Sequence, residues 1–280
     1  MDTKITRLKN NIEFAYKRNR NTPRIAFYLN FSLNNPLPDP GVYSLMVRLF
    51  MQGTKKRSAQ ALSEELDKYA IEFSAEMKLD YVKFKFVCLN EDFERAMEIF
   101  SDIVKNTTFE EFEKERTKLE GEIIAELDSP RVKVIDSYYK NIYEGHNYGY
   151  TNTVILENLK NITKEDVVNA YKAIVDNSKK VAVFVGDLDY ERVDGLLEDY
   201  LGDITPSVEN LPQLKRPELT ETKKVEVIQQ DAGSTGQYQL IIGKSRSSFQ
   251  HIRQIILDLL FPASRQQCDY RFILKIIFGA

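Results

Sequence analysis

The residue types that build catalytic metal sites are scarce in this chain. Its 280 residues include two histidines, His146 and His251, and two cysteines, Cys88 and Cys268. A catalytic zinc ion is held by two or three histidines with a carboxylate, typically with paired histidines on one helix. The two histidines lie in different segments, so the sequence contains no H-x-x-x-H pair. Two distant cysteines make no metal-binding knuckle, and Cys88, which ends a strand-like run, is predicted to be a small buried hydrophobe.

The composition limits the classes of partner. Hydrophobic residues make up 42% and charged residues 29%, and the formal net charge is −3, as in ordinary soluble globular proteins. Such a balance gives no electrostatic reason to expect nucleic acid or an anionic membrane as partner. No apolar run reaches the roughly 18 residues of a membrane span, and the first residues do not resemble a secretory signal. We therefore predict a cytoplasmic protein.

The residues of greatest interest lie on a predicted helix that follows a strand. Residues 25–33 alternate between apolar and polar side chains, which predicts a half-buried strand. After Gly41 the period becomes helical, and Gly53 is predicted to close the helix. The apolar stripe of this helix consists of Val42, Leu45, Met46, Leu49 and Phe50.

The remaining pattern predicts an α+β fold. Residues 71–79 and 82–88 alternate and are separated by a short turn, so they should form an antiparallel hairpin. Other strands are expected at 12–16 and 181–185. Further helices are expected from Ser58, at 92–105, 110–128, 130–143 and 164–175, and after Asp189. Local strand pairing and consecutive helices favour an antiparallel sheet with helices packed on one face.

The chain divides at a proline-containing segment. Residues 1–205 form the first predicted domain, and residues 206–222, with Pro206, Pro212 and Pro217, form a linker. Residues 223–280 are predicted to be the incomplete or aberrant start of a second, similar domain. Beyond Gly243 the pattern no longer fits such a domain.

The helix after Gly41 resembles a known metal-binding motif. The insulinase (pitrilysin) family of zinc peptidases, which includes processing-peptidase-like members, carries G-x-x-H-x-x-E-H-x-x-F-x-G-T on this helix. The frame is retained here from Gly41 to Gly53 and Thr54. Ser44 stands in place of the first histidine ligand, Val47 in place of the catalytic glutamate, and Arg48 in place of the second histidine.

Other segments resemble the same family in the same order. The run from Glu115 through Glu122 to Pro130 is similar to the family helix whose later glutamate is the third zinc ligand. This similarity implies that Glu122 occupies a ligand position and that Glu115 matches an acidic neighbour. Residues 145–149 resemble a family H-P-Y-G turn, residues 161–166 the next helix start, and residues 183–189 a V-V-x-G-D-x-D strand end. The resemblance covers roughly residues 5–230.

The substitutions remove the chemistry that the resemblance would imply. In the family, zinc lowers the pKa of a bound water to about 7 and the motif glutamate takes its proton. Ser44 is a poor zinc ligand, Val47 cannot accept a proton, and Arg48 stays positively charged and repels a cation. We therefore expect no metal or other cofactor in this chain. We also hypothesise that Arg48 pairs with Glu122 and so replaces the metal as a structural cross-link.

Simpler interpretations stand beside these. Glu115 and Glu122 would also suit a solvated acidic helix edge, and Arg48 a surface cation. His146 suits a turn, and no role is expected for His251. Ser44 as a nucleophile would need a histidine base within hydrogen-bonding distance.

Three functions follow as hypotheses. The first is a non-catalytic partner subunit that shapes the peptide-binding chamber of a homologous zinc-bearing peptidase and grips extended peptides. The second is an atypical zinc metalloendopeptidase with divergent ligands. The third is a peptide-binding scaffold protein without a peptidase partner.

Overall fold

The computed structural model describes residues 3–32, 39–78, 81–144 and 146–209. These residues fall into two compact units. Met1–Gly121 and Ile155–Arg216 belong to the first unit, and Glu122–Val154 belongs to the second. The predicted second domain at 223–280, and the predicted linker beyond residue 209, lie outside the described residues, so the predicted domain boundaries stay predictions.

A six-stranded sheet forms the centre of the first unit, in the order β1-β2-β6-β3-β5-β4. Its strands, in chain order, are β1 (Thr3–Arg7), β2 (Glu13–Arg18), β3 (Arg24–Ser32), β4 (Glu72–Met77), β5 (Tyr81–Leu89) and β6 (Lys179–Gly186). Four of the five pairings are antiparallel, and β2 with β6 is parallel. The predicted hairpin of β4 and β5 is confirmed, with Met77 opposite Val82.

The sheet has one buried face because its strands alternate apolar and polar residues with the period of the pleat. In β3, Ile25, Phe27, Leu29 and Phe31 are fully buried, and the residues between them are only partly buried. Helix α3 (Phe93–Asn106) packs against this face. There the ring of Phe100 meets the ring of Phe27 edge-on, with centroids 5.4 Å apart.

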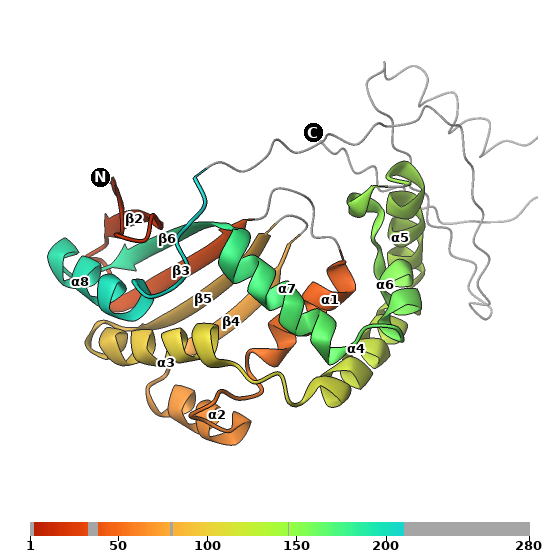
Figure 1. Ribbon diagram of the computed structural model, residues 1–280, viewed down its shortest axis with the longest axis horizontal. Helices are drawn as coiled ribbons and strands as arrows, with labels where there is room; N and C mark the ends of the chain where they lie inside the picture. The colour runs from red at the N-terminus through yellow and green to blue at the C-terminus, as the bar shows by residue number, and fades with distance from the viewer. Residues whose placement is uncertain (1–2, 33–38, 79–80, 145, 210–280) are drawn as a thin grey trace, which may run out of the picture. The chain divides into compact units, whose positions relative to one another are not determined.

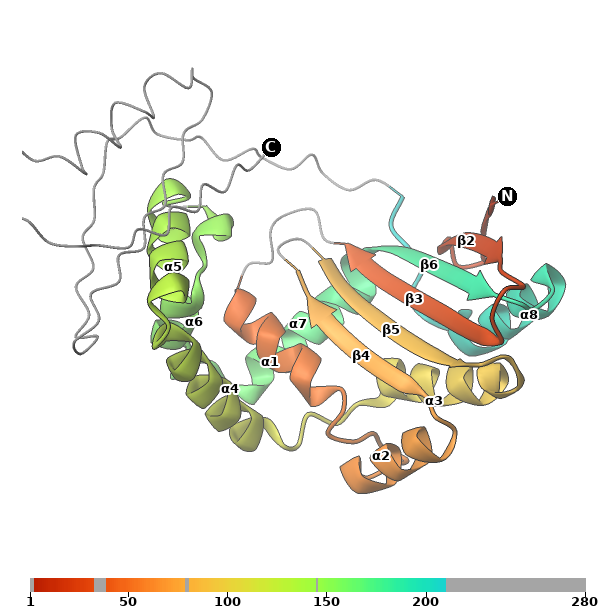
Figure 2. The same cartoon turned by 180° about the vertical axis from the view of Figure 1, so that it is seen from behind.

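The helices of the first unit cover that buried face. Figure 1 shows α1, α3, α7 and α8 in front of the sheet, and Figure 2, from behind, shows β3 and β5 with no described helix over them. The helices that lie wholly in this unit are α1 (Pro40–Leu49), α2 (Ala59–Lys68), α3, α7 (Lys164–Asn177) and α8 (Tyr190–Leu201), and η1 (Asn90–Asp92) is a single 3₁₀ turn. The predicted α+β class with helices on one face is thus confirmed.

The second unit, over its described residues, is helical. It contains α5 (Pro130–Ile142), the 3₁₀ turn η2 (Asn147–Gly149), the last residues of α4 (Phe112–Leu127) and the first of α6 (Asn152–Leu159). The rings of Tyr139 on α5 and Tyr143 at its C-cap stack, with centroids 6.0 Å apart. No described helix is long and apolar enough to cross a membrane.

Two local expectations differ from the structure. Helix α1 ends at Leu49, before Gly53, and Gly53 instead adopts a φ of +117° in a turn bridged to Ser58. Asp189 stands at the N-cap of α8 but makes no capping hydrogen bond. Its carboxylate pairs instead with Arg18 of β2. A hydrogen bond to a charged guanidinium is stronger than one to a backbone N–H group, and water can bind the free N–H groups at the start of α8.

A lysine is buried in the first unit at the edge of this core. Lys180 of β6 is 0% exposed, and its Nζ donates to the carbonyl oxygens of Ser178 at 3.3 Å and Pro206 at 3.2 Å. Burial lowers the pKa of Lys180 from 10.5 to about 8, against a smaller opposing effect of Asp176. Because the charged form is disfavoured in the folded chain, Lys180 costs stability wherever it must carry its proton.

Replacing Lys180 by methionine is expected to stabilise the chain at neutral pH by about 1–2 kcal/mol. The substitution removes the cost of burying a charged ammonium group, and this gain exceeds the contribution of the two hydrogen bonds that are lost. The folded pKa of about 8 lies below the unfolded value of 10.5. The unfolded chain therefore binds more protons between these values, and the wild type gains stability relative to Lys180→Met as pH rises through that window. Urea unfolding of both proteins at neutral and alkaline pH measures this difference. A gap that does not change with pH would contradict the assignment.

Candidate functional site

Helix α1 is well defined by its sequence. The Asp39 side chain caps it by accepting hydrogen bonds from the backbone N–H groups of Gly41 at 2.9 Å and Val42 at 3.3 Å. Pro40 at the first helical position has a backbone angle already suited to a helix. A Cβ on Gly41 would lie 2.9 Å from Cδ1 of Ile162, so glycine allows the helix start to approach the segment before α7. The predicted apolar stripe is buried against the core.

The three altered motif residues lie on α1 and are partly exposed. Ser44, Val47 and Arg48 are each intermediate in burial. The Ser44 hydroxyl donates a weak contact to Sδ of Met77 in β4, at 3.8 Å. A hydroxyl, an isopropyl group and a guanidinium give this face no group that could hold a divalent cation and none that could accept a proton from water.

Arg48 faces a buried carboxylate. Its Nη1 lies 3.9 Å from Oε2 of Glu115 on α4, and the Glu115 side chain is 5% exposed. The other oxygen of Glu115 accepts a hydrogen bond from Nζ of Lys118, one turn further on, at 2.7 Å. A carboxylate withdrawn from water needs such compensation. Two cations therefore neutralise Glu115, and a positive charge stands beside the altered motif.

Glu122 follows seven residues after Glu115 on the same helix and belongs to the second unit. Its side chain is exposed. The hypothesis that Arg48 pairs with Glu122 stays a prediction, whereas the contact of Arg48 with Glu115 is found. Among the described residues no group of three or more His, Cys, Asp and Glu side chains is arranged to hold a metal ion.

The structure describes one of the two histidines, which lies in the second unit. His146 sits in the turn before η2, where its Nδ1 accepts a hydrogen bond from the backbone N–H of Tyr148 at 3.1 Å. The two rings meet at 4.8 Å between centroids, which agrees with the turn interpretation. His251 lies outside the described residues. Cys88 is buried, as expected, and burial raises the pKa of its thiol to about 12.

Sequence reasoning missed a charged cluster formed by Arg57, which precedes α2, with acids of α2 and α3. Arg57 donates to the carboxylates of Glu65, Glu98 and Asp102, and Asp102 is 4% exposed in its side chain. The sequence does indicate an acidic pair, because Glu98 and Asp102 are four residues apart and therefore share one face of α3. Their partner could not be identified, because Arg57 lies more than forty residues away.

The Arg48–Glu115 contact makes a stability prediction. Arg48→Ala should lower the free energy of unfolding by about 1–2 kcal/mol, because the buried carboxylate of Glu115 loses one of its two cations. The loss stays moderate because Arg48 is itself partly exposed to water. Chemical denaturation measures the loss, with Arg48→Lys as the charge-retaining control and Glu115→Gln completing a double-mutant cycle. Additive effects of the two single changes would show that the contact contributes nothing.

Comparisons with known proteins agree with the α+β fold just described, a peptidase-type domain. Residues 21–153 match the family profile "Insulinase (Peptidase family M16)", and residues 161–260 match "Peptidase M16 inactive domain". This chain belongs to the insulinase family.

The relatives include subunits of processing peptidases. The chain is 25% identical over 176 residues to a probable mitochondrial-processing peptidase subunit beta of Schizosaccharomyces pombe, covering 61% of this chain and 38% of the relative. It is 25% identical over 167 residues to the human mitochondrial-processing peptidase subunit beta, covering 58% and 34%. The chain thus spans less than half the length of these relatives.

Solved structures share the fold. A peptidase M16 inactive domain from Pseudomonas fluorescens superposes with a TM-score of 0.69 at 16% identity, covering 78% of this chain and 53% of that one. A protease from Helicobacter pylori gives a TM-score of 0.68 at 16% identity, covering 79% and 55%. At such identity the likeness is one of fold.

Proposed function

We propose that this chain is a non-catalytic member of its family that acts as a partner subunit and shapes the peptide-binding chamber of a zinc-bearing homologue. The observation that carries the proposal is the guanidinium of Arg48, which stands at a motif ligand position and lies 3.9 Å from the carboxylate of Glu115. The site has an internal cation where a catalytic chain needs a metal ligand.

The retained framework supports a role that depends on shape. The cap at Asp39, the glycine contact at Gly41 and the buried stripe of α1 are all kept. Loss of the ligands at Ser44 and Arg48 thus leaves the helix position intact. The relatives named as beta subunits of processing peptidases support a function within an assembly of subunits.

The sheet offers a place for an extended peptide. Among the described strands β4 lies at one edge, and Met77 of β4 contacts Ser44 of α1. An edge strand presents unpaired backbone N–H and C=O groups, so a peptide can add as a further strand without specific side chains. In this proposal the peptide passes along β4, and zinc is supplied by the partner subunit.

Mixing tests the proposal. The chain and a homologue with an intact H-x-x-E-H motif are assayed against a quenched fluorescent peptide, separately and together, with and without a chelator. We expect activity that is strongest in the mixture and is abolished by the chelator. Chelator-sensitive activity of this chain alone would favour an atypical metalloendopeptidase, and peptide binding without any effect on a homologue would favour a scaffold. The cytoplasmic location stays a prediction.

A proline in β4 tests the edge-strand step. Lys78 donates to the carbonyl of Tyr81, so by antiparallel alternation the N–H of Ala75 points away from β5. Ala75→Pro removes that outward donor and keeps the hydrogen bonds to β5. In the mixed assay the KM for peptide should rise by about threefold to tenfold, the value of one hydrogen bond. Ala75→Ser, which keeps the N–H, is the control. An unchanged KM in Ala75→Pro would exclude strand addition at β4.

A further inference from the structure

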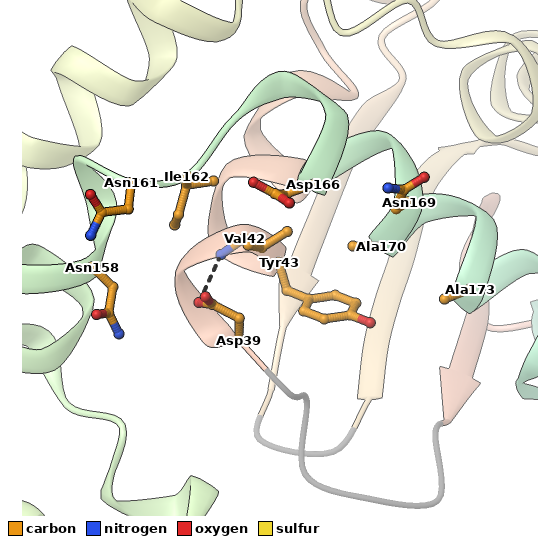
Figure 3. Close-up of a pocket in the computed structure, with 10 residues that line it drawn as sticks. All are labelled: Asp39, Val42, Tyr43, Asn158, Asn161, Ile162, Asp166, Asn169, Ala170 and Ala173. Atoms are coloured by element: carbon orange, nitrogen blue, oxygen red, sulfur yellow. Dashed lines mark hydrogen bonds between the residues drawn. The ribbon is translucent and has the colours of Figure 1, made fainter.

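A groove lies between the start of α1 and helix α7, within the first unit. Its volume is about 520 Å³, which is in the range of pockets that bind small molecules or single peptide side chains. Figure 3 shows α1 on one side, with Val42 and Tyr43, and α7 on the other, with Ala170 and Ala173. These side chains and Ile162 give the groove an apolar floor.

A tyrosine hydroxyl that lines this groove makes no hydrogen bond within the described residues. Tyr43 is 2% exposed, and its hydroxyl makes no hydrogen bond to any other described residue, in contrast to Tyr171 on α7, which donates to the carbonyl of Val104 at 2.8 Å. Figure 3 shows Tyr43 extending along the groove toward Ala173. Burial raises the pKa of Tyr43 to about 12, so the hydroxyl keeps its proton. The ring of Tyr43 is therefore buried, and its hydroxyl can donate a hydrogen bond to a molecule in the groove.

Amide and carboxylate groups surround the floor. Asn158, Asn161 and Asn169 line the groove, and their side-chain amides make no hydrogen bond to other described residues. Such amides can both donate and accept, as a peptide backbone requires. Asp39 uses one oxygen to cap α1, and Asp166 uses one oxygen to accept from Thr163.

The remaining oxygens of these two carboxylates are available to a ligand. The described lining contains Asp39 and Asp166 and no basic side chain. An apolar floor inside a rim of negative charge favours an apolar group that carries a cation next to it.

We infer that this groove binds a short extended peptide segment in which an apolar side chain is flanked by lysine or arginine. The apolar side chain lies on the floor formed by Val42, Ile162 and Ala170, and a backbone carbonyl of the segment accepts from the Tyr43 hydroxyl. The amides of the asparagines bind the backbone, and Asp39 and Asp166 bind the basic side chains. This site is separate from the altered motif residues and from the β4 edge, so it goes beyond the proposed function.

Peptide binding to the full chain tests the inference without any partner subunit. The probe is Gly-Lys-Leu-Lys-Gly with an N-terminal fluorescein and an amidated C-terminus, followed by fluorescence anisotropy. We expect saturable binding that Tyr43→Phe weakens by about threefold to tenfold, as for one hydrogen bond. Ala173→Phe, which fills the groove, should weaken it more than about tenfold by excluding the leucine. Tyr171→Phe is the matched control and should leave Kd unchanged.

Two altered probes complete the design. Replacing both lysines of the peptide by glutamate, or its leucine by glycine, should each abolish saturable binding. Equal binding of the acidic and basic probes, equal Kd for the wild type and Ala173→Phe, or no saturation up to about 1 mM would overturn the inference. Competition by n-butylamine as effective as by the unlabelled peptide would overturn the peptide assignment in favour of a small amine. Because no homologue is present, these outcomes are independent of the mixing assay.

Discussion

With Ser44→His, Val47→Glu and Arg48→His combined, the chain is expected to bind zinc stoichiometrically, whereas the unaltered chain is not. The three changes restore two imidazoles one helical turn apart and a carboxylate between them, and they remove the guanidinium that repels a cation. The family resemblance supplies Glu122 as the third ligand. Helix α1 keeps its cap at Asp39 and its close glycine contact, so the new side chains replace partly exposed ones on an unchanged frame.

Zinc content after dialysis, measured by mass spectrometry, gives the readout, and circular dichroism verifies the fold. The double variant Ser44→His with Val47→Glu keeps Arg48 and lacks the second imidazole, so it should stay without zinc. The triple variant with Glu122→Gln should bind zinc much more weakly. A correctly folded triple variant that takes up no zinc would mean that α1 and Glu122 do not present their side chains to one point.

Removal of Arg57 is expected to produce the largest loss of stability of any single change considered. Its guanidinium contacts Glu65 at 2.6 Å, Glu98 at 3.0 Å and Asp102 at 2.6 Å. Burial opposes its charge, yet hydrogen bonds to the three carboxylates raise the pKa of Arg57 above its usual value. Arg95 also pairs with Glu65 and Glu98, so Arg57→Ala mainly leaves the buried carboxylate of Asp102 without its cation. We expect a loss of about 3–5 kcal/mol at neutral pH, as for a broken buried ion pair.

The pH dependence of this loss has a definite sign. Burial raises the pKa of Asp102, but hydrogen bonds from Thr54, Asn106 and Arg57 outweigh it and lower the pKa below its usual 3.8. In the wild type the ionised Asp102 stabilises the fold above that value, and this contribution disappears as pH falls through its lowered pKa. Without Arg57 the ionised form of Asp102 loses its cation, so the difference between the proteins should shrink in acid.

Urea unfolding across acid and neutral pH measures the effect of Arg57→Ala. Arg24→Ala is a matched control, because Arg24 pairs with Glu72 in a contact exposed by more than half on both sides, and such pairs contribute little. If Arg57→Ala loses as little stability as Arg24→Ala, water must solvate the three carboxylates in place of Arg57, and the prediction would be wrong.

The sequence predicted the strands and helices whose side chains alternate between core and solvent. The regular alternation in β3 and the helical stripe of α1 are local patterns, and both elements appear near their expected positions. Strand β1 was missed because its one large apolar residue, Ile5, is 68% exposed at a sheet edge. Helix α6 was missed because its eight residues are too few for a clear helical period.

Pairings between distant segments could not be predicted in this way. The parallel match of β2 with β6 places Ala15 opposite Val183, and no local pattern in either strand encodes that neighbour. It inserts β6 between β2 and β3, so the sheet is mixed, whereas local hairpins had favoured an antiparallel one. The same reason explains why Arg57 was not paired with its three acids.

The site was predicted in part. Motif spacing identified Ser44, Val47 and Arg48 as replaced positions, because the helix frame around them is retained. The pairing of Arg48 with Glu122, suggested by the family frame, stays a prediction, and the structure adds a contact of Arg48 with Glu115. The groove at Tyr43 left no signal in the sequence, because its walls come from α1 and from residues 158–173, which include the first half of α7.

The metal content of the purified, unaltered chain tests the central claim most directly. After expression in zinc-supplemented medium and dialysis against metal-free buffer, zinc is quantified per chain by inductively coupled plasma mass spectrometry. We expect zinc far below one ion per chain, because Ser44, Val47 and Arg48 provide neither ligands nor a base. Stoichiometric zinc that is lost on substitution of Glu122 would contradict this account and would restore the chain to the catalytic members of its family.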